Sequence, residues 1–344
     1  MPATKSKIVI RTILLAGTVI SLYFVPWILI WAWILPLPDT VQGQLNEGIE
    51  HGFDGTIVYI QQGDRPAELY AAGWHDRDRM IRAYPEAYFK IASIGKLYDA
   101  VAITKLVAED LISLDKSILN YFPEFAGRIE HAENITVKML VQHRSGIPNF
   151  TDVPDFWMNP PENKEQTLNL FLDKPASFSP GTDYAYSNSN YFLLGLLMEK
   201  ATNNSKAQVI QQEILEPLQL ENTFFSLNDI DQDKLMSGYY VGVEEDIKST
   251  NYQSMIATAQ DVGIFIKALN TGKLLTKAEE KIYSSIYVYD HTGLIPGYQS
   301  IAEYHENIDT VVIQFVNTAN FEGYTWRISE IVYDRIIKIL EKRD

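Results

Sequence analysis

The sequence of 344 residues contains no cysteine. This absence excludes disulfides, thiolate metal sites, a cysteine nucleophile and a lipoprotein anchor, because each of them needs a thiol. Three other signatures are also missing, since no His-Glu-x-x-His, no Gly-x-Ser-x-Gly and no glycine-rich phosphate loop occurs. The sequence therefore gives no support to a zincin, an α/β-hydrolase or a nucleotide-binding protein.

Acidic residues are absent from the first 38 positions, where Lys5, Lys7 and Arg11 are the charged groups. The net charge of the whole chain is −15, so the remainder is strongly acidic. Phosphate backbones would repel such a surface, and nucleic acid is not expected as a partner. With 46% hydrophobic residues and 20 tyrosines, the chain can bury the core of a globular protein.

No charge occurs over the 25 residues from Thr12 to Pro36. As one helix, residues 13–35 would be roughly 34 Å long, enough to cross a hydrocarbon layer of about 30 Å. A cleaved signal peptide has an apolar region of about 7–15 residues and ends in small residues. This run ends instead in bulky side chains, including Trp31 and Trp33. We therefore predict a cytosolic basic tail over residues 1–11 and an uncleaved transmembrane anchor over residues 12–36.

The charges on the two sides of this segment differ in sign. Basic residues precede it, whereas Asp39, Glu47 and Glu50 follow it. The positive-inside rule then places the amino terminus in the cytosol. We expect a single-pass protein of the cytoplasmic membrane with its catalytic domain on the outer side, periplasmic or extracellular.

Strand-forming runs lie near both ends of the chain, at residues 56–60 and 67–72 and again at 298–304 and 310–316. Between them, the sequence predicts helical pieces broken by proline and glycine. The pattern predicts an α+β fold in which one antiparallel sheet is built from both ends of the chain and flanked by helices. The predicted catalytic domain covers residues 39–344. Its α/β lobe comprises 39–110 and 275–344, and a mostly helical lobe, 111–274, is inserted.

Ser93-Ile94-Gly95-Lys96 opens a predicted apolar helix that runs to about residue 109. Positions i and i+3 share one face of a helix, so the Ser93 hydroxyl and the Lys96 amine can touch. A serine needs a base to become a nucleophile, and a lysine can be that base when it is buried. The helix amino end also places the Ser93 N–H where it could stabilise an oxyanion. Ser113 and Lys116 have the same spacing, but their acidic, solvated surroundings indicate a chance match.

Two further motifs follow, each about a hundred residues after the one before. Tyr186-Ser187-Asn188 is the only Tyr-x-Asn in the chain, and its phenol could exchange a proton with the serine while the Asn188 amide pairs with Lys96 or a substrate carbonyl. His291-Thr292-Gly293 offers a hydroxyl for a substrate carboxylate and a glycine against which a substrate backbone can lie. Taken singly, either motif could equally be a helix cap, a packed ring or a structural histidine.

Together with the surrounding segments, these motifs carry a resemblance. Matching stretches are Leu140-Val141-Gln142-His143-Arg144-Ser145-Gly146-Ile147-Pro148, Phe178-Ser179-Pro180-Gly181-Thr182, Pro217-Leu218-Gln219-Leu220 and Gly293-Leu294-Ile295-Pro296-Gly297-Tyr298. From about residue 50 to its end, the chain resembles the serine β-lactamase and penicillin-binding protein superfamily. It is most similar to the class C β-lactamase and D,D-carboxypeptidase branch, which also contains esterases and D-aminopeptidases.

The resemblance implies a role for each motif residue. Ser93 would be the acylated nucleophile, and Lys96 with Tyr186 would transfer protons. Asn188, His291, Thr292 and Gly293 would bind substrate, and the backbone N–H groups of Ser93 and Leu294 would form the oxyanion hole. No metal or cofactor is implied.

One departure concerns the third motif. β-Lactamases carry lysine where this chain has His291, and a histidine with a pKa of about 6.5 is mostly neutral at pH 7. Binding of a substrate carboxylate, and hence efficient β-lactamase activity, is in question for that reason.

These observations predict a membrane-anchored serine hydrolase that acts on small-molecule or peptide substrates, through an acyl-enzyme on Ser93. Peptides ending in D-alanine or related compounds are the favoured substrates, by analogy with the family. A carboxylesterase for small acyl esters is the alternative, and a catalytically quiet envelope protein that binds penicillin or peptidoglycan is a third possibility.

Several other residues receive a structural interpretation. The loop that contains His143 and Ser145 is interpreted as structural, and the turns at residues 76–78 and 231–233 are interpreted as solvated. Phe156 and Trp157 could line a cleft or belong to the core.

Overall fold

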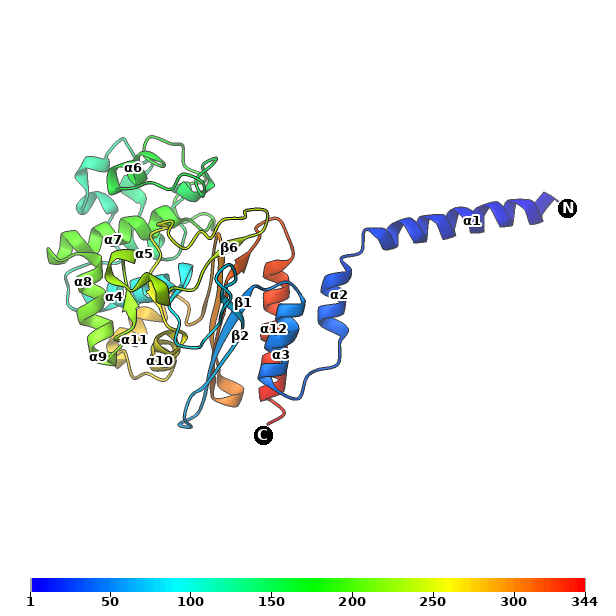
Figure 1. Ribbon diagram of the computed structural model, residues 1–344. Coiled ribbons are helices and arrows are strands. Elements are labelled where there is room, and N and C mark those ends of the chain that lie inside the picture. Colours follow the sequence, from blue (N-terminus) through cyan, green and yellow to red (C-terminus); the bar gives the residue numbers. More distant parts are fainter. Residues whose placement is uncertain (1, 344) are drawn as a thin grey trace.

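A six-stranded antiparallel sheet forms the centre of the protein, in the order β3-β2-β1-β10-β9-β8 (Figure 1). The computed structural model describes residues 2–343. The strands are β1 (Gly55–Gln62), β2 (Glu68–Asp76), β3 (Ile81–Arg82), β8 (His291–Ile295), β9 (Tyr298–His305) and β10 (Thr310–Val316). β1 pairs with β10, so the first and last long strands are neighbours. The prediction of one α+β sheet built from both ends of the chain is confirmed.

Helices cover both faces of this sheet (Figure 1). α3 (Val41–Glu50) and α12 (Thr325–Leu340) pack on one face, where Val58 and Val312 point. α10 (Ala259–Asn270) packs on the other face, which carries Ile57 and Ile313. Because both faces are covered, β1 and β10 are apolar at nearly every position instead of alternating. α10 lies before residue 274, the predicted end of the helical lobe, and it contacts β1, β9 and β10 of the sheet.

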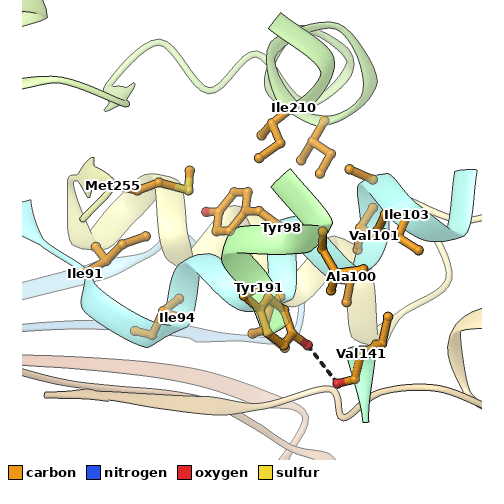
Figure 2. Packing of buried hydrophobic residues seen from close by; sticks show 14 of the residues in the cluster. Ile91, Ile94, Tyr98, Ala100, Val101, Ile103, Val141, Tyr191, Ile210 and Met255 are labelled. Atoms are coloured by element: carbon orange, nitrogen blue, oxygen red, sulfur yellow. Dashed lines mark hydrogen bonds between the residues drawn. The ribbon is translucent and has the colours of Figure 1, made fainter. Parts of the chain in front are cut away.

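The helix after Ser93, α4 (Gly95–Ala108), is surrounded by other elements (Figure 2). Its apolar side chains, such as Tyr98 and Val101, are fully buried. Figure 2 shows them packed among residues of neighbouring segments, including Tyr191, Ile210 and Met255. A helix that is apolar on every side is stable only inside a protein, as the sequence predicted.

The inserted lobe consists of short helices and irregular chain. Its helices are α5 (Val137–Val141), α6 (Lys164–Asn169), α7 (Asn188–Thr202), α8 (Lys206–Ile210) and α9 (Glu216–Leu218). α11 (Lys277–Tyr283) follows α10 and packs on α4. Two small sheets join the lobes, β4 (Phe89–Lys90) with β7 (Ile256–Ala257) and β5 (Thr223–Phe224), and β6 (Tyr239–Tyr240) with β11 (Thr318–Ala319).

The amino-terminal segment is two helices, α1 (Pro2–Tyr23) and α2 (Trp27–Ile34), so the prediction of one continuous helix over residues 12–36 is wrong. Pro26 separates them, because proline has no N–H to continue a helical ladder. Within the described residues one helical stretch, Ser6–Tyr23, is long and apolar enough to cross a membrane, and none of it is buried. The stretch therefore begins earlier and ends earlier than predicted, and α2 instead packs on α12.

The turn after β2 also differs from its prediction. Asp76 is only 5% exposed and accepts a hydrogen bond from the Arg79 backbone N–H. Arg77 forms an ion pair of 3.0 Å with Asp54, and Arg79 forms one of 2.9 Å with Asp233. The turn at residues 231–233 is exposed, as predicted. The turn at residues 76–78 is only partly solvated, and Arg79 joins the two turns.

Gly263 tests the packing of α10 on the sheet. A Cβ at this position would lie 2.2 Å from the Tyr59 ring. Overpacking costs about 1–3 kcal/mol, whereas alanine gains about 1 kcal/mol of helix propensity over glycine. We expect Gly263→Ala to lower the free energy of unfolding by up to about 2 kcal/mol in urea titrations. Gln260→Ala, at an exposed position of the same helix, is the control, and an equal effect of both would contradict this packing.

Candidate active site

Ser93 lies in the 3₁₀ turn η1 (Ala92–Ile94), which leads directly into α4. Ala92 has φ of 50°, in the left-handed region, where a non-glycine residue costs about 1–3 kcal/mol. Contacts hold it there, because its N–H donates to Ser254 Oγ at 2.9 Å and the preceding Ile91 carbonyl accepts from Ser300 Oγ at 3.1 Å. The turn that presents the serine is therefore fixed from both sides.

Two predicted partners contact the Ser93 hydroxyl. Lys96 Nζ donates to Ser93 Oγ at 3.0 Å, and Tyr186 OH donates to the same oxygen at 2.7 Å. Lys96 is 8% exposed, and its Nζ also donates to Asn188 Oδ1 at 2.8 Å. The structure thus brings together a hydroxyl, a buried amine, a phenol and an amide from segments 93 residues apart. Either the amine or the phenol, once deprotonated, is placed to take the serine proton.

Asn149 is a member of this network that the sequence did not predict. Its Oδ1 accepts from the Asn188 backbone N–H at 2.9 Å and from Asn188 Nδ2 at 3.2 Å. Its own Nδ2 donates to Thr151 Oγ1 at 2.7 Å and to Asp152 Oδ1 at 2.8 Å. Because the Asn188 Nδ2 group is held in this way, its Oδ1 must point to Lys96. Polar residues directly after the Ser-Gly-Ile-Pro stretch were the available signal.

His143 contacts two residues of the second motif, Tyr186 and Ser187. Its Nδ1 accepts from the Ser187 backbone N–H at 3.0 Å, and its ring stacks on Tyr186 with centroids 4.4 Å apart. Burial, with the Lys96 charge as a second cause, lowers the pKa of His143 to about 3. A neutral imidazole that holds a backbone N–H positions Tyr186, and no contact joins it to Ser93. The structural interpretation of this loop agrees with that placement.

The third motif forms the edge strand β8, next to η1. His291 does not enter the contacts around Ser93. Its Nδ1 lies 2.5 Å from the Thr292 carbonyl and therefore donates, so its Nε2 accepts from Tyr287 OH at 2.9 Å. Burial lowers the pKa of His291 to about 4. The ring is neutral at pH 7, and both of its nitrogens are occupied.

The packing around Gly293 requires a glycine at this position. A Cβ there would lie 2.5 Å from the Ile91 carbonyl oxygen and 3.0 Å from Ala92 Cβ. Glycine therefore lets β8 approach the turn before Ser93, and no space for a substrate backbone lies on that side. Thr292 is exposed at the strand edge, whereas Leu294 lines the cleft.

A cleft of about 640 Å³ opens beside Ser93 between the two lobes. Two ion pairs lie in its lining, Lys206 with the buried Asp99 at 2.7 Å and Lys164 with Glu199. Burial raises the pKa of Asp99, and the charges of Lys206 and Lys96 oppose that rise. The acid three residues after Lys96 in an apolar helix was a signal that the sequence analysis did not use.

Aromatic rings form the mouth of this cleft. Trp157 packs edge-on against Tyr252 and Phe321, with ring centroids 5.7 and 5.6 Å apart. Phe156 contacts Trp157 and is 8% exposed. All four rings line the cleft, so Phe156 belongs to the core and the cleft wall at once.

Lys90 fixes the cleft wall that carries Tyr252. Its buried Nζ donates to the Thr250 carbonyl at 2.6 Å, and burial lowers the pKa of Lys90 to about 7. Within residues 2–343, no three side chains of His, Asp or Glu come together in a way that could hold a metal ion.

The second pair with Ser-x-x-Lys spacing, Ser113 and Lys116, is called here the decoy motif, and it lies away from the cleft. The Ser113 N–H donates to Tyr121 OH at 2.8 Å, and Lys116 is exposed. Neither residue lines the cleft.

Comparison with known proteins decides the family. The model of the beta-lactamase family, described as "Beta-lactamase", matches residues 38–285. The chain belongs to the beta-lactamase family. Among curated proteins it is similar to Protein flp of Staphylococcus aureus strain MW2, with 29% identity over 195 residues. That match covers 55% of this chain and 39% of the relative, so the chain corresponds to less than half of the relative's length.

Solved structures show the same fold. D-amino acid amidase from Ochrobactrum anthropi SV3 complexed with D-phenylalanine has a TM-score of 0.77 at 19% identity and covers 88% of this chain and 98% of its own. The penicillin binding protein from Bacillus halodurans has a TM-score of 0.73 at 20% identity, with 87% and 98% covered. These two proteins therefore share the α+β fold of this chain.

Protonation of the buried histidines predicts a dependence of stability on pH. His143 and His291 have lowered pKa values of about 3 and about 4 in the folded protein, against about 6.5 when unfolded. Below about pH 6.5, the two histidines bind protons in the unfolded chain but not in the folded chain. The free energy of unfolding should hold above about pH 6.5 and fall as pH decreases, by up to about 1.4 kcal/mol per pH unit for each histidine.

Urea titrations between pH 7.5 and pH 4.5 measure this slope. His143→Asn should reduce the slope, although it also lowers stability at every pH. His131→Asn, at a surface histidine with 41% of its side chain exposed, is the control. Equal slopes in the His143 variant and the parent would contradict the placement of His143.

Proposed function

We propose that this protein is a serine hydrolase that acts through an acyl-enzyme on Ser93. The observation that carries the proposal is the pair of contacts on one oxygen, from Lys96 Nζ at 3.0 Å and Tyr186 OH at 2.7 Å. A binding protein has no need of a buried amine at this place. Membership of the beta-lactamase family supports the same conclusion.

The reaction follows from the contacts. Ser93 Oγ attacks the carbonyl carbon of the substrate, and its proton passes to Lys96 or Tyr186. The backbone N–H groups of Ser93 and Leu294 receive the oxyanion, where a single donor is typically worth about 3–4 kcal/mol. Tyr186, the more exposed of the two proton carriers, returns a proton to the leaving group. Water then attacks the acyl-enzyme by the same route and frees Ser93.

The substrate that we propose is an amide, most suitably a peptide ending in D-alanine or a related compound. Support comes from the printed names of similar structures, a penicillin binding protein and a D-amino acid amidase. An N-acetylmuramyl-L-alanine amidase of Bacillus subtilis strain 168 is also similar, at 24% identity over 206 residues. Asn188 and Thr292 would bind the substrate amide and its polar end.

We also propose that α1 anchors the enzyme in the cytoplasmic membrane. The stretch Ser6–Tyr23 has the length and composition of a membrane span. Lys5, Lys7 and Arg11 at its amino end favour a cytosolic amino terminus. The catalytic domain would then face the outside, where cell-wall peptides occur.

Carboxylesterase activity on small acyl esters is the second candidate, and one observation favours it. The cations in the cleft lining are Lys96, Lys164 and Lys206, and each already has a partner. His291 is neutral, as its lowered pKa shows. No cation of the described cleft is free to hold a terminal carboxylate, and an ester or amide without that group needs none.

Covalent labelling tests the nucleophile. The protein is exposed separately to a penicillin, an alkyl phosphonate and a D-Ala-D-Ala peptide, and adducts are located by mass spectrometry. We expect an adduct on Ser93, absent from Ser93→Ala. Ser113→Ala, which removes the serine of the decoy motif, should keep it. An adduct on another residue, or undiminished hydrolysis by Ser93→Ala, would overturn Ser93 as the nucleophile. No adduct and no hydrolysis with any of the three reagents would make a binding protein the better interpretation.

Substitution of His291 tests the substrate class. His291→Lys supplies a cation beside Thr292, at the strand edge. It should raise kcat/KM for a D-Ala-D-Ala peptide relative to the methyl ester of that peptide, because only the free acid gains an ion pair. His291→Gln, which adds no charge, is the control. An unchanged ratio in His291→Lys would show that the substrate carboxylate does not lie near the third motif.

A further inference from the structure

Between the anchor and the catalytic domain, α2 presents an unusual surface. All eight of its residues, Trp27–Ile34, are apolar. Only one side faces the protein, where Ala32 is 1% exposed and Leu29 packs with the core under α12. Ile30 is partly buried. The five remaining side chains are exposed over two-fifths or more of their surface, and these are Trp27, Ile28, Trp31, Trp33 and Ile34. Large contiguous apolar surfaces of this kind mark contact sites.

Arg335 fixes this helix to the catalytic domain. The guanidinium is 5% exposed and donates to the carbonyl of Leu35 at 2.8 Å and of Pro36 at 2.9 Å, directly after α2. It also donates to Gln44 Oε1 at 2.7 Å and to Glu47 Oε2 at 3.0 Å, both on α3. If α2 swung free of the domain, a buried cation would lose two acceptors, which is costly. The segment after the anchor is therefore held as part of the domain.

The position of α1 indicates what covers the exposed side of α2. Figure 1 shows α2 outside α3 and α12, and α1 running away from the domain beyond it. Only residues 24–26 separate the two helices, a reach of about 10 Å at most. Ser6–Tyr23 as a helix is about 27 Å long, slightly less than a hydrocarbon layer of about 30 Å. If α1 crosses the bilayer, α2 must lie at the surface of that bilayer.

The composition of α2 fits this position. Three of the six tryptophans of the chain lie within its eight residues. Tryptophan prefers the layer between headgroups and acyl chains, where its ring is apolar and its N–H meets water. No charged residue occurs between Arg11 and Asp39, so nothing on α2 favours full exposure to water.

We infer that α2 is an interfacial helix that lies in the headgroup layer of the membrane and, through Arg335, seats the catalytic domain on the lipid surface. The sheet separates α2, α3 and α12 from α4 and Ser93 (Figure 1). The domain is thereby held with its cleft turned away from the bilayer, toward substrates outside the membrane. The inference rests on the anchoring proposed for α1.

Spin labels on single cysteines test the inference, because the natural chain has none. Full-length Gly17→Cys, Ile28→Cys, Ile34→Cys and Glu165→Cys are labelled and reconstituted in phosphatidylethanolamine–phosphatidylglycerol vesicles. Position 17 lies in α1 and position 165 is an exposed site of the far lobe. We expect labels at 28 and 34 to collide more with oxygen than with a water-soluble nickel chelate, and the label at 165 to do the reverse.

The outcomes separate the two proposals. Labels at 28 and 34 that behave as in water, while the label at 17 is in hydrocarbon, would overturn the interfacial role of α2 and leave the anchor standing. A label at 17 in water would overturn the anchor itself. Spectral broadening at 28 and 34 that vanishes on dilution with unlabelled protein would show that a second copy covers α2, and would also overturn the inference.

A second measurement tests the role of Arg335. Labels on Ile34→Cys and Lys338→Cys, an exposed position of α12, report the distance between α2 and the domain. The distribution of distances between the two labels should be narrow when Arg335 is present and broader in Arg335→Gln. Arg327→Gln, at an exposed arginine of the same helix, is the control. A distribution that stays narrow in Arg335→Gln would show that Arg335 does not hold α2.

Discussion

The position of the Lys96 amine depends on the burial of α4, since most residues of this helix are enclosed by the protein. α4 packs against α7, α8 and α11, and its Tyr98 stacks on Phe265 of α10. In these surroundings Lys96 is 8% exposed and has two oxygen partners, Ser93 Oγ and Asn188 Oδ1. On a surface helix the same side chain would be free to adopt other rotamers, and its amine would not be held within hydrogen-bond distance of Ser93 Oγ. The fold around α4 is thus the condition for the chemistry of the site.

Each lobe supplies what the other lacks. The α/β lobe presents Ser93 from a turn that β8 approaches closely, because Gly293 has no side chain to keep it away from Ile91. The helical lobe brings Tyr186 and Asn188, and it orients them with His143 and Asn149. Residues of both lobes line the cleft. Its polar end is at the serine, and its apolar end is the ring cluster around Trp157.

Much of the fold could be predicted from the sequence, since β1 and β10 were expected within two residues of their ends. Local periodicity was strong in these elements. The amino-terminal segment was predicted less well, because hydropathy alone does not distinguish a helix in lipid from one that docks on a protein. Pro26 was the visible sign of the break. Nothing local in the sequence indicates that α10, which lies before the predicted lobe boundary at 274, packs on the sheet.

The sequence by itself determined the family resemblance, the sheet built from both chain ends and the residues that meet at Ser93, because spacing and apolar context are local properties. Only the tertiary structure decided what each of them touches. It turned His291 toward Tyr287, gave Gly293 a packing role, and added Asn149 to the network. It also docked α2 on α12 through Arg335. These outcomes depend on contacts between residues far apart in the chain, whose partners no local pattern specifies.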